Sequence, residues 1–262
     1  MLPDSVVDRM PKATIRSKYM LQFITFLIGL VTLMPQHAFS QNSTTDNALV
    51  LVLLGPPGSG KGTQAVELSR RFTIPHISTG DLFRFNMKED TALGRQAKEF
   101  INKGLLVPDS LVLDMLFDRL KNSDCAKGFL LDGFPRTVPQ AQSLDTHLKT
   151  LSHRLIVIDL QVSDAEVVRR ITGRRTCASC GKIYHIQTTP PKKEGVCDSC
   201  QGTLTQRADD TREVVESRLK VYHEQTKPLE DYYRNKGVLH TVDGTQSPGS
   251  VFEQMCTVIN KK

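Results

Sequence analysis

An unbroken apolar run, ALVLVLL at residues 48–54, leads directly into a glycine-rich segment that ends in Lys61 and Gly62. A run of this length is typical of a strand buried on both faces of a parallel sheet. Residues 55–61 match G-x-x-x-x-G-K, in which backbone N–H groups surround phosphate oxygens and the lysine adds a charge. We expect a strand, a phosphate-binding loop and a helix over 62–72; the alternative is a glycine-rich turn with an exposed lysine.

The hydroxyl of this loop stands one position later than usual, at Thr63, because Gly62 follows Lys61. In the common form of the motif a serine or threonine directly after the lysine holds Mg²⁺. Direct coordination by a hydroxyl is therefore not expected. We expect a water-mediated contact with Mg²⁺, steered by a carboxylate such as Asp132.

Further apolar runs alternate with helical patterns along the chain. Leucines in residues 109–121 recur on one helix face, and residues 163–174 begin with a capping box from Ser163 to Glu166. Residues 212–236 predict a long charged helix with a kink at Pro228. The alternation predicts an α/β fold, a parallel sheet with helices on both faces. The strands expected after the first one are 129–131, 155–160 and 238–242.

Four cysteines interrupt this alternation within residues 175–207, which hold prolines and glycines and no good helix. Their pattern, C-x₂-C-x₁₆-C-x₂-C, is typical of a tetrahedral four-thiolate metal site. We expect a structural metal in an inserted lobe, because four protein ligands leave no open position for catalysis. Zinc is the default, with iron or cobalt left open; the alternative is two disulfides, which need an oxidising compartment. The expected ligands are Cys177, Cys180, Cys197 and Cys200.

The N-terminal extension, residues 1–47, differs from the rest of the chain. Basic residues precede an apolar stretch at 19–34, and residues 38–40 resemble a cleavage site, which is the pattern of a signal peptide. The stretch is short for a membrane span. The alternative is a mis-assigned start, because Met20 and Met34 are both candidate starts.

The formal net charge of +6 admits either a nucleic acid or a small polyanion as partner. The arginines stand near motifs and do not form basic runs interleaved with aromatic residues, which favours a nucleotide. Two cysteines remain outside the metal pattern, and we expect reduced, partly buried thiols at Cys125 and Cys256.

Taken together, four segments resemble the adenylate kinases, in particular bacterial members with a long, metal-binding lid. The resemblance implies a P-loop nucleoside monophosphate kinase fold over residues 48–262. Within that domain it implies an AMP-binding region at 78–107 and a zinc-binding lid at 174–207. The segments that carry the resemblance are 55–63, 78–84, 131–136 and 207–210.

The resemblance implies the reaction MgATP + AMP ⇌ 2 ADP, which serves adenine nucleotide homeostasis. Phosphoryl transfer asks a protein mainly for positioning and charge neutralisation, which explains why many arginines are needed. Asp132 would orient waters on the Mg²⁺ that accompanies ATP. The catalytic residues that the resemblance implies are Lys61, Asp132, Arg136, Arg174, Arg207 and Arg218.

The resemblance also implies the contacts of the donor nucleotide. Arg170 would stack on the adenine of ATP, and main chain near Gln246 would close the base pocket. The implied ATP-binding residues are Gly58, Ser59, Gly60, Lys61, Gly62, Thr63, Arg170, Arg174, Ile183, Tyr184 and Gln246.

For the acceptor nucleotide, Gln140 would read the base, because its amide both donates to and accepts from the adenine edge. Backbone at 105–107 would contact adenine and ribose. The implied AMP-binding residues are Thr79, Arg84, Leu105, Leu106, Val107, Gly133, Phe134, Pro135, Arg136, Gln140, Arg207 and Arg218.

Two other functions stay open at this point. One is a kinase for another monophosphate, such as UMP or CMP, although the long lid, Thr79 and Gln140 favour AMP. The second is a nucleic-acid-binding zinc ribbon joined to an ATPase, although residues 175–207 are poor in aromatics. We expect ATP, AMP and ADP as partners, no nucleic acid, no stable membrane association and a monomer. An ATP-dependent enzyme needs a nucleotide pool, so we expect a cytoplasmic location, with export left open by the N-terminal segment.

Overall fold

The computed structural model describes residues 47–150 and 152–261. The signal-like pattern predicted at residues 1–40 lies outside the described residues. Within the described part of the chain, no helix is both long and apolar enough to cross a membrane.

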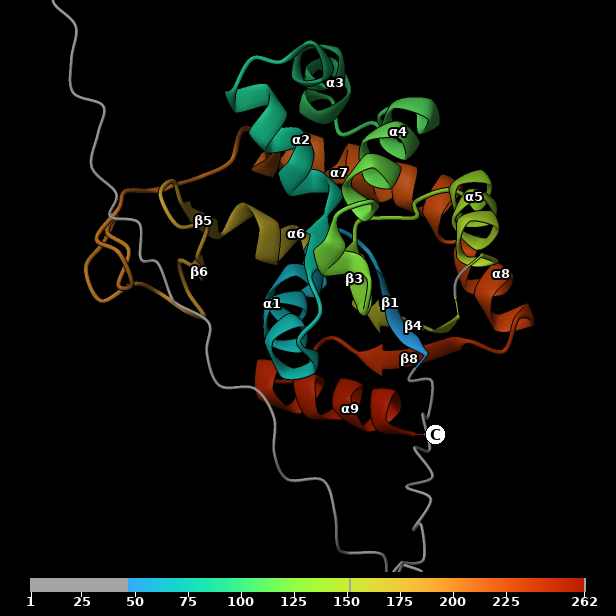
Figure 1. Cartoon of the computed structure of the whole chain (residues 1–262). Helices are drawn as coiled ribbons and strands as arrows, with labels where there is room; N and C mark the ends of the chain where they lie inside the picture. The colour runs from blue at the N-terminus through green and yellow to red at the C-terminus, as the bar shows by residue number, and fades with distance from the viewer. Residues whose placement is uncertain (1–46, 151, 262) are drawn as a thin grey trace, which may run out of the picture. The chain divides into compact units, whose positions relative to one another are not determined.

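Five parallel strands form the central sheet, in the order β2-β3-β1-β4-β8 (Figure 1). The predicted α/β class with a parallel sheet is therefore confirmed. The central strand is the apolar run at residues 48–54, and its residues 50–53 are almost completely shielded from solvent. The strands are β1 (Ala48–Leu54), β2 (His76–Ser78), β3 (Gly128–Asp132), β4 (His153–Gln161) and β8 (Leu239–Asp243).

Helices cover both faces of the sheet, as the sequence predicts (Figure 1). On one face, α1 (Lys61–Phe72) and α9 (Pro248–Asn260) pack their apolar residues on β1 and β4. On the other face, α4 (Asp109–Leu120), α5 (Val138–Leu148) and α8 (Leu229–Asn235) form the second core cluster. A short 3₁₀ turn, η1 (Ser123–Cys125), precedes β3.

Two further helices, α2 (Thr79–Lys88) and α3 (Ala92–Asn102), follow β2 and pack closely on each other. Gly94 permits this contact: a Cβ built on it would lie 2.1 Å from the carbonyl oxygen of Asn86. A side chain at this position would therefore force the two helices apart.

A small antiparallel sheet lies between the sixth and seventh helices. Helix α6 (Asp164–Thr172) leads into β5 (Arg174–Cys177), and the sheet order is β6-β5-β7. The chain returns through a 3₁₀ turn, η2 (Ala208–Asp210), to α7 (Arg212–Val221). The remaining strands of this lobe are β6 (Ile183–His185) and β7 (Leu204–Thr205).

Two local predictions differ from the structure. The long helix predicted over 212–236 is interrupted by a π-helical turn, η3 (Tyr222–Thr226), before α8 begins. Pro228 has no N–H to donate, and the chain accommodates it with an i→i−5 bond from Lys227 N to Tyr222 O, 2.8 Å. The break therefore begins six residues before the proline.

The predicted capping box at the start of α6 is only half formed. Ser163 Oγ accepts from Glu166 N at 3.4 Å, but the Glu166 carboxylate pairs with Arg169 and Arg170 and does not reach back. The helix also ends at Thr172, because Arg174 already belongs to β5.

Candidate active site

The loop between β1 and α1 folds around its own lysine. Lys61 Nζ donates to the carbonyl oxygens of Gly55 and Pro56 at 2.8 and 2.7 Å, and lies 3.2 Å from Ser59 Oγ. Burial lowers the pKa of the ammonium to about 8, while the nearby Asp132 carboxylate opposes that shift. An anionic ligand would therefore relieve a buried positive charge.

The start of α1 is shaped for an anion. Gly60 is its N-cap in the left-handed region, φ 103°, and within the described residues no side chain caps the helix. Gly55 has φ 129°, and a Cβ there would lie 2.5 Å from the Leu160 carbonyl oxygen. The first N–H groups of the helix are thus left for phosphate oxygens, the arrangement that the motif predicts.

Asp132, at the end of β3, lies beside the position that departs from the common motif. A Cβ built on Gly62 would lie 3.4 Å from Asp132 Oδ2. His76 approaches the same oxygen from β2, with Nε2 at 3.4 Å. The carboxylate therefore stands where a side chain at position 62 would point, while Thr63 is exposed on α1.

Arginines that lie far apart in the sequence gather next to this loop. Burial lowers the pKa of Arg207 to about 10, and the positive charges of Arg84 and Arg174 add to the effect. Burial also lowers the pKa of Arg218 to about 10, where Arg174 and Arg136 contribute. The charges of Arg136 and Arg218 reach Lys61 as well. The predicted catalytic cations therefore share one electrostatic environment.

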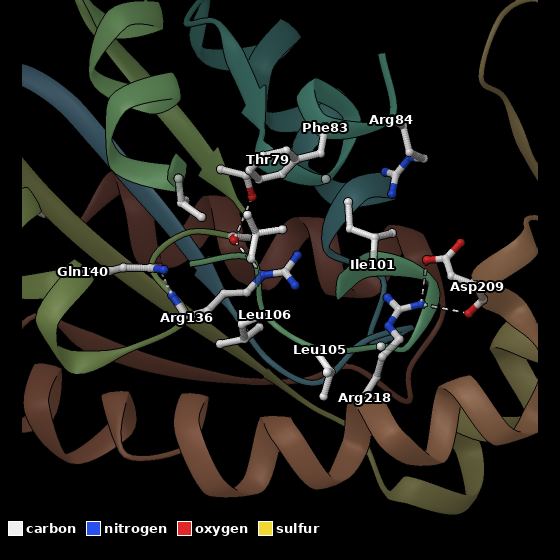
Figure 2. A pocket seen from close by; sticks show the side chains of 15 residues that line it. Thr79, Phe83, Arg84, Ile101, Leu105, Leu106, Arg136, Gln140, Asp209 and Arg218 are labelled. Atoms are coloured by element: carbon white, nitrogen blue, oxygen red, sulfur yellow. Dashed lines mark hydrogen bonds and ion pairs between the residues drawn. The ribbon is translucent and has the colours of Figure 1, made fainter. Parts of the chain in front are cut away.

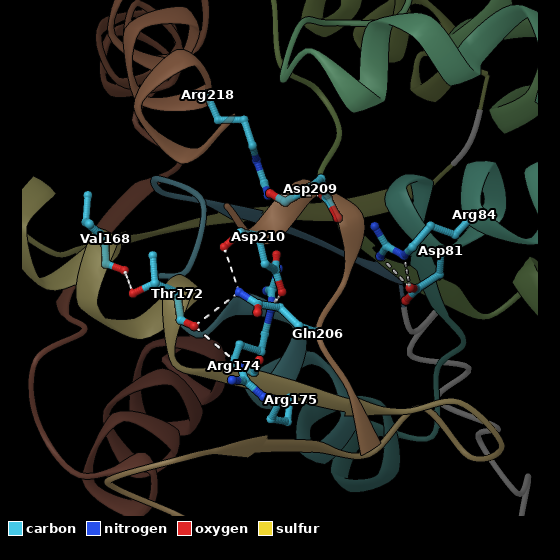
Figure 3. Close-up of polar contacts among 10 residues, drawn as sticks. All are labelled: Asp81, Arg84, Val168, Thr172, Arg174, Arg175, Gln206, Asp209, Asp210 and Arg218. Carbon is cyan, nitrogen blue, oxygen red and sulfur yellow. Dashed lines mark hydrogen bonds and ion pairs between the residues drawn. The ribbon is translucent and has the colours of Figure 1, made fainter. Parts of the chain in front are cut away.

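Two aspartates pair with two of these arginines, and Figure 3 shows their arrangement. Arg174 Nε donates to Asp210 Oδ2 at 2.9 Å, and its Nη2 donates to Oδ1 of the same fully buried carboxylate. Arg218 Nη1 pairs with Asp209 Oδ2 at 3.1 Å. These aspartates could not be given a role from the sequence, because nothing local in the sequence identifies their partners.

Gln206 forms hydrogen bonds to the two chain segments that enter and leave the β5–β7 lobe (Figure 3). Its Nε2 donates to the carbonyl oxygen of Thr172 at 3.3 Å and to that of Asp210 at 3.1 Å. With the Arg174–Asp210 pair, this contact closes the base of the lobe.

Most residues implied for AMP line one pocket, to which α2, α3, α4, α5 and α7 contribute side chains (Figure 2). Thr79 Oγ1 donates to the carbonyl oxygen of Gly133 at 2.8 Å, and Arg136 Nε donates to the same oxygen at 2.8 Å. Among the described residues, the lining does not include Phe134, whose side chain is buried in the core, Pro135 or Arg207. The implied residues that line it are Thr79, Arg84, Leu105, Leu106, Val107, Gly133, Arg136, Gln140 and Arg218.

The Gln140 amide is held at both ends. Oε1 accepts from Arg136 N at 2.8 Å, and Nε2 donates to Asp109 Oδ1 at 2.6 Å. Gln140 is 1 % exposed and lines the pocket. Asp109 is a third residue that could not be given a role from the sequence, since it is 31 positions away from its partner.

On the donor side, Arg170 lies between the phosphate loop and the segment after β8. Its Nε donates to Glu166 Oε1 at 2.6 Å, and its Nη1 lies 3.4 Å from the carbonyl oxygen of Ser59. Gln246 Nε2 contacts Asp243 Oδ2 at 3.5 Å, and the charge of Arg170 reaches that carboxylate. The structure thus brings Arg170 and the Gln246 segment to the same side of the loop.

The four predicted metal ligands come together in the lobe. Their sulfur atoms lie within 4.8 Å of one another and form no disulfide. Cys177 and Cys200 are 3.4 Å apart at sulfur, and Cys180 and Cys197 are 3.6 Å apart. Thiolates around a tetrahedral zinc lie roughly 3.8 Å apart, for bonds of about 2.3 Å. The donor set therefore fits such an ion. Cys125 and Cys256 are free thiols.

The lobe also contains a polar group that supports one ligand. Tyr184 is 4 % exposed; its hydroxyl accepts from Asp198 N at 2.8 Å and lies 3.5 Å from Cys197 Sγ. Because the hydroxyl oxygen is engaged by Asp198 N–H, its own hydrogen is free to be donated to the sulfur. Such bonds orient metal ligands. The Tyr184 ring is thus inside the lobe, while Ile183 is 40 % exposed.

A buried carboxylate lies near the phosphate loop at Asp159 of β4. It is 1 % exposed, and within the described residues Oδ1 has no hydrogen-bond partner. Burial raises the pKa of Asp159 to about 6, and the Glu230 carboxylate adds to the shift, while Gln161 and Lys61 oppose it. At neutral pH the ionised Asp159 carboxylate therefore lowers the free energy of unfolding.

Comparisons with known proteins give one family. The family model described as "Adenylate kinase" matches residues 53–238. A protein named adenylate kinase from Caldanaerobacter subterraneus subsp. tengcongensis is 54 % identical over 206 residues, which cover 78 % of this chain and 93 % of that protein. One with the same name from Carboxydothermus hydrogenoformans is 51 % identical over 212 residues, 80 % of this chain and 99 % of its own length.

The Asp159 carboxyl generates a prediction about stability. Its pKa is higher in the folded state than the ordinary 3.8, so the folded state binds this proton more tightly and stability falls as pH rises from about 4 to 6. Asp159→Asn removes the titration. At pH 7.5 the variant should be more stable than the parent by up to about 3 kcal/mol, and at pH 4 the two should differ little.

Urea unfolding at both pH values measures this difference, with the exposed Asp231→Asn as control. An Asp159→Asn effect of equal size at both pH values would show that the buried carboxyl does not titrate as described.

Proposed function

The chain belongs to the adenylate kinase family and catalyses phosphoryl transfer between MgATP and AMP, and we propose which of its residues carry that reaction. The observation behind the proposal is that Lys61 of the phosphate loop interacts electrostatically with Arg136 and Arg218. The same two arginines line the pocket that we assign to AMP. Two anion sites would thus lie next to each other. Family membership favours AMP over UMP or CMP, and it does not favour a zinc-ribbon ATPase.

We assign the donor nucleotide to the phosphate loop. Backbone N–H groups of residues 58–63 would surround its phosphates, with Lys61 at the β- and γ-phosphates. Asp132 would hold the waters of Mg²⁺, because Gly62 supplies no hydroxyl and the carboxylate lies next to it. Arg170 would stack on the adenine, and the backbone of Ile183, Tyr184 and Gln246 would complete the ATP site.

The transfer itself places an oxygen of the AMP phosphate in line with the γ-phosphorus. The new P–O bond forms as the bond to the β,γ-bridging oxygen breaks, so that each product is an ADP. Negative charge spreads over the three equatorial oxygens of the transferred group. Arg136, Arg174, Arg207 and Arg218 would neutralise that charge through bidentate contacts, and the pairs with Asp209 and Asp210 would hold two of them in place.

AMP would occupy the pocket of Figure 2. Arg84 and Arg136 would bind its phosphate, the backbone of 105–107 and 133–135 would contact the nucleoside, and Gln140 would read the base. Thr79 fixes Gly133 by its hydrogen bond. The AMP-binding region would therefore include residues 78–107, the range that the family resemblance implies.

The lobe at 174–207 would act as a lid that closes over ATP and excludes water. We propose zinc as its ion, held by Cys177, Cys180, Cys197 and Cys200. Zinc would supply no chemistry beyond joining two ends of a lobe with a small core of four buried residues. We also propose that the protein works as a monomer in the cytoplasm, where its nucleotide substrates are available, and needs neither nucleic acid nor membrane.

Replacement of the loop lysine tests the donor site. Lys61→Ala should reduce kcat by about 10³-fold or more, because a charge on the β- and γ-phosphates is lost in a site shielded from water. Folding should persist, since among the described residues the hydrogen bonds of this side chain all go to its own loop. A coupled ADP assay and thermal melting provide the data, with the exposed Lys121→Ala as control. Near-native activity of folded Lys61→Ala would refute this placement of ATP.

Removal of two metal ligands tests the role of the lid metal. Cys197→Ser/Cys200→Ser should lose about one zinc ion per chain and melt several degrees lower, because metal binding at a structural site is coupled to folding. Activity well below the melting temperature should fall only modestly. Elemental analysis, calorimetry and kinetics on one preparation give the three values, and Cys125→Ser/Cys256→Ser is the matched control. A metal-free variant with unchanged melting and no activity would instead make the metal catalytic.

A further inference from the structure

Asp109 and Gln140 share a hydrogen bond beside the pocket that we assign to AMP. Asp109 begins α4, and Gln140 stands in the first turn of α5. Gln140 Nε2 donates to Asp109 Oδ1 at 2.6 Å, and Thr137 Oγ1 donates to Asp109 Oδ2 at 2.9 Å. Both oxygens of this carboxylate are therefore acceptors for groups at the start of α5.

The oxygen of the Gln140 amide faces a hydrogen-bond donor, whereas its nitrogen faces an acceptor. Arg136 N donates to Oε1 at 2.8 Å. A backbone N–H can only donate, and a carboxylate engaged by two donors accepts. Rotation of the amide by 180° would place its NH₂ against the N–H and its oxygen against Asp109. Two buried hydrogen bonds would be replaced by two repulsive contacts, so the amide has one allowed orientation.

That constraint matters because a free glutamine can serve two kinds of purine. Adenine presents a donor at its 6-amino group and an acceptor at N1. A 6-oxopurine presents the reverse, an acceptor at O6 and a donor at N1. An amide that rotates freely can match either pattern, whereas an amide held in one orientation matches one of them.

We propose that Asp109 is a specificity-determining positioning residue, which fixes the Gln140 amide so that the site selects adenine over 6-oxopurines. The proposal rests on the assignment of Gln140 to the base of the acceptor nucleotide. Asp109 itself would touch Gln140 and Thr137 rather than the nucleotide. If Asp109 only joined α4 to α5, its loss would change stability and leave the preference between bases unaltered.

Inosine 5′-monophosphate is the appropriate probe, because hypoxanthine differs from adenine at position 6 and N1 and carries no 2-amino group. The measured quantity is kcat/KM for this probe divided by kcat/KM for AMP. Asp109→Asn keeps the shape of the side chain but can donate as well as accept. It should raise the ratio about tenfold, the size of one hydrogen bond to a charged group, while KM for ATP stays within about twofold.

The control variant is Asp118→Asn, which makes the same change on the exposed side of the same helix and should leave the ratio unaltered. Thermal melting verifies that each variant is folded. If Asp109→Asn does not fold, Asp109→Ser, whose hydroxyl can also donate or accept, carries the test.

Gln140→Leu separates the two assignments. It should abolish most of the discrimination, and adding Asp109→Asn to it should not change the ratio further, since the two residues act through one amide. If Gln140→Leu leaves the ratio unaltered, the base-reading role of Gln140 is wrong. If Gln140→Leu changes the ratio but folded Asp109→Asn does not, the role of Asp109 is overturned and that of Gln140 stands.

Discussion

The active site depends on holding several buried guanidinium groups close to one another and to Lys61. Burial lowers the pKa of Arg207 and Arg218 to about 10, and the neighbouring arginines add to this destabilisation of the charged forms. Asp81, Asp132, Asp209 and Asp210 offset part of the repulsion, but five arginines and a lysine exceed four carboxylates. The phosphates of two nucleotides would supply the missing negative charge, which makes the positive excess a means of binding and of transition-state stabilisation.

One of these aspartates, Asp210, also links an arginine of the site to the base of the lobe that we propose as a lid. Arg174 follows the last residues of α6, and its partner Asp210 precedes α7, so the ion pair joins the two segments at the base of the lobe. Gln206 reinforces this closure through the carbonyl oxygens of Thr172 and Asp210. The cysteine cluster lies within the lobe, and it fixes the shape of the part that would move. If the lobe closes over ATP as proposed, its base would have to rearrange around the arginines.

The sequence predicted what is encoded locally: the buried run at 48–54, the loop up to Lys61, the cysteine pattern and the α/β class. It did not predict β2, because three residues are too few for a periodic signal, nor the π-helical turn before Pro228. In the site, the arginines could be named through a family resemblance, while Asp109, Asp209 and Asp210 could not be given roles. Their partners are set by the tertiary fold: Asp109 meets Gln140, and Asp210 meets Arg174.

The central claim is that one positive site receives both nucleotides at once. Calorimetric titration with two adenosines joined through five phosphates tests it most directly, since such a molecule carries both bases and the transferring phosphate. The account predicts one molecule bound per chain, far more tightly than ATP or AMP alone, with competition from each nucleotide. Binding of two molecules per chain, or competition from only one of the nucleotides, would contradict it.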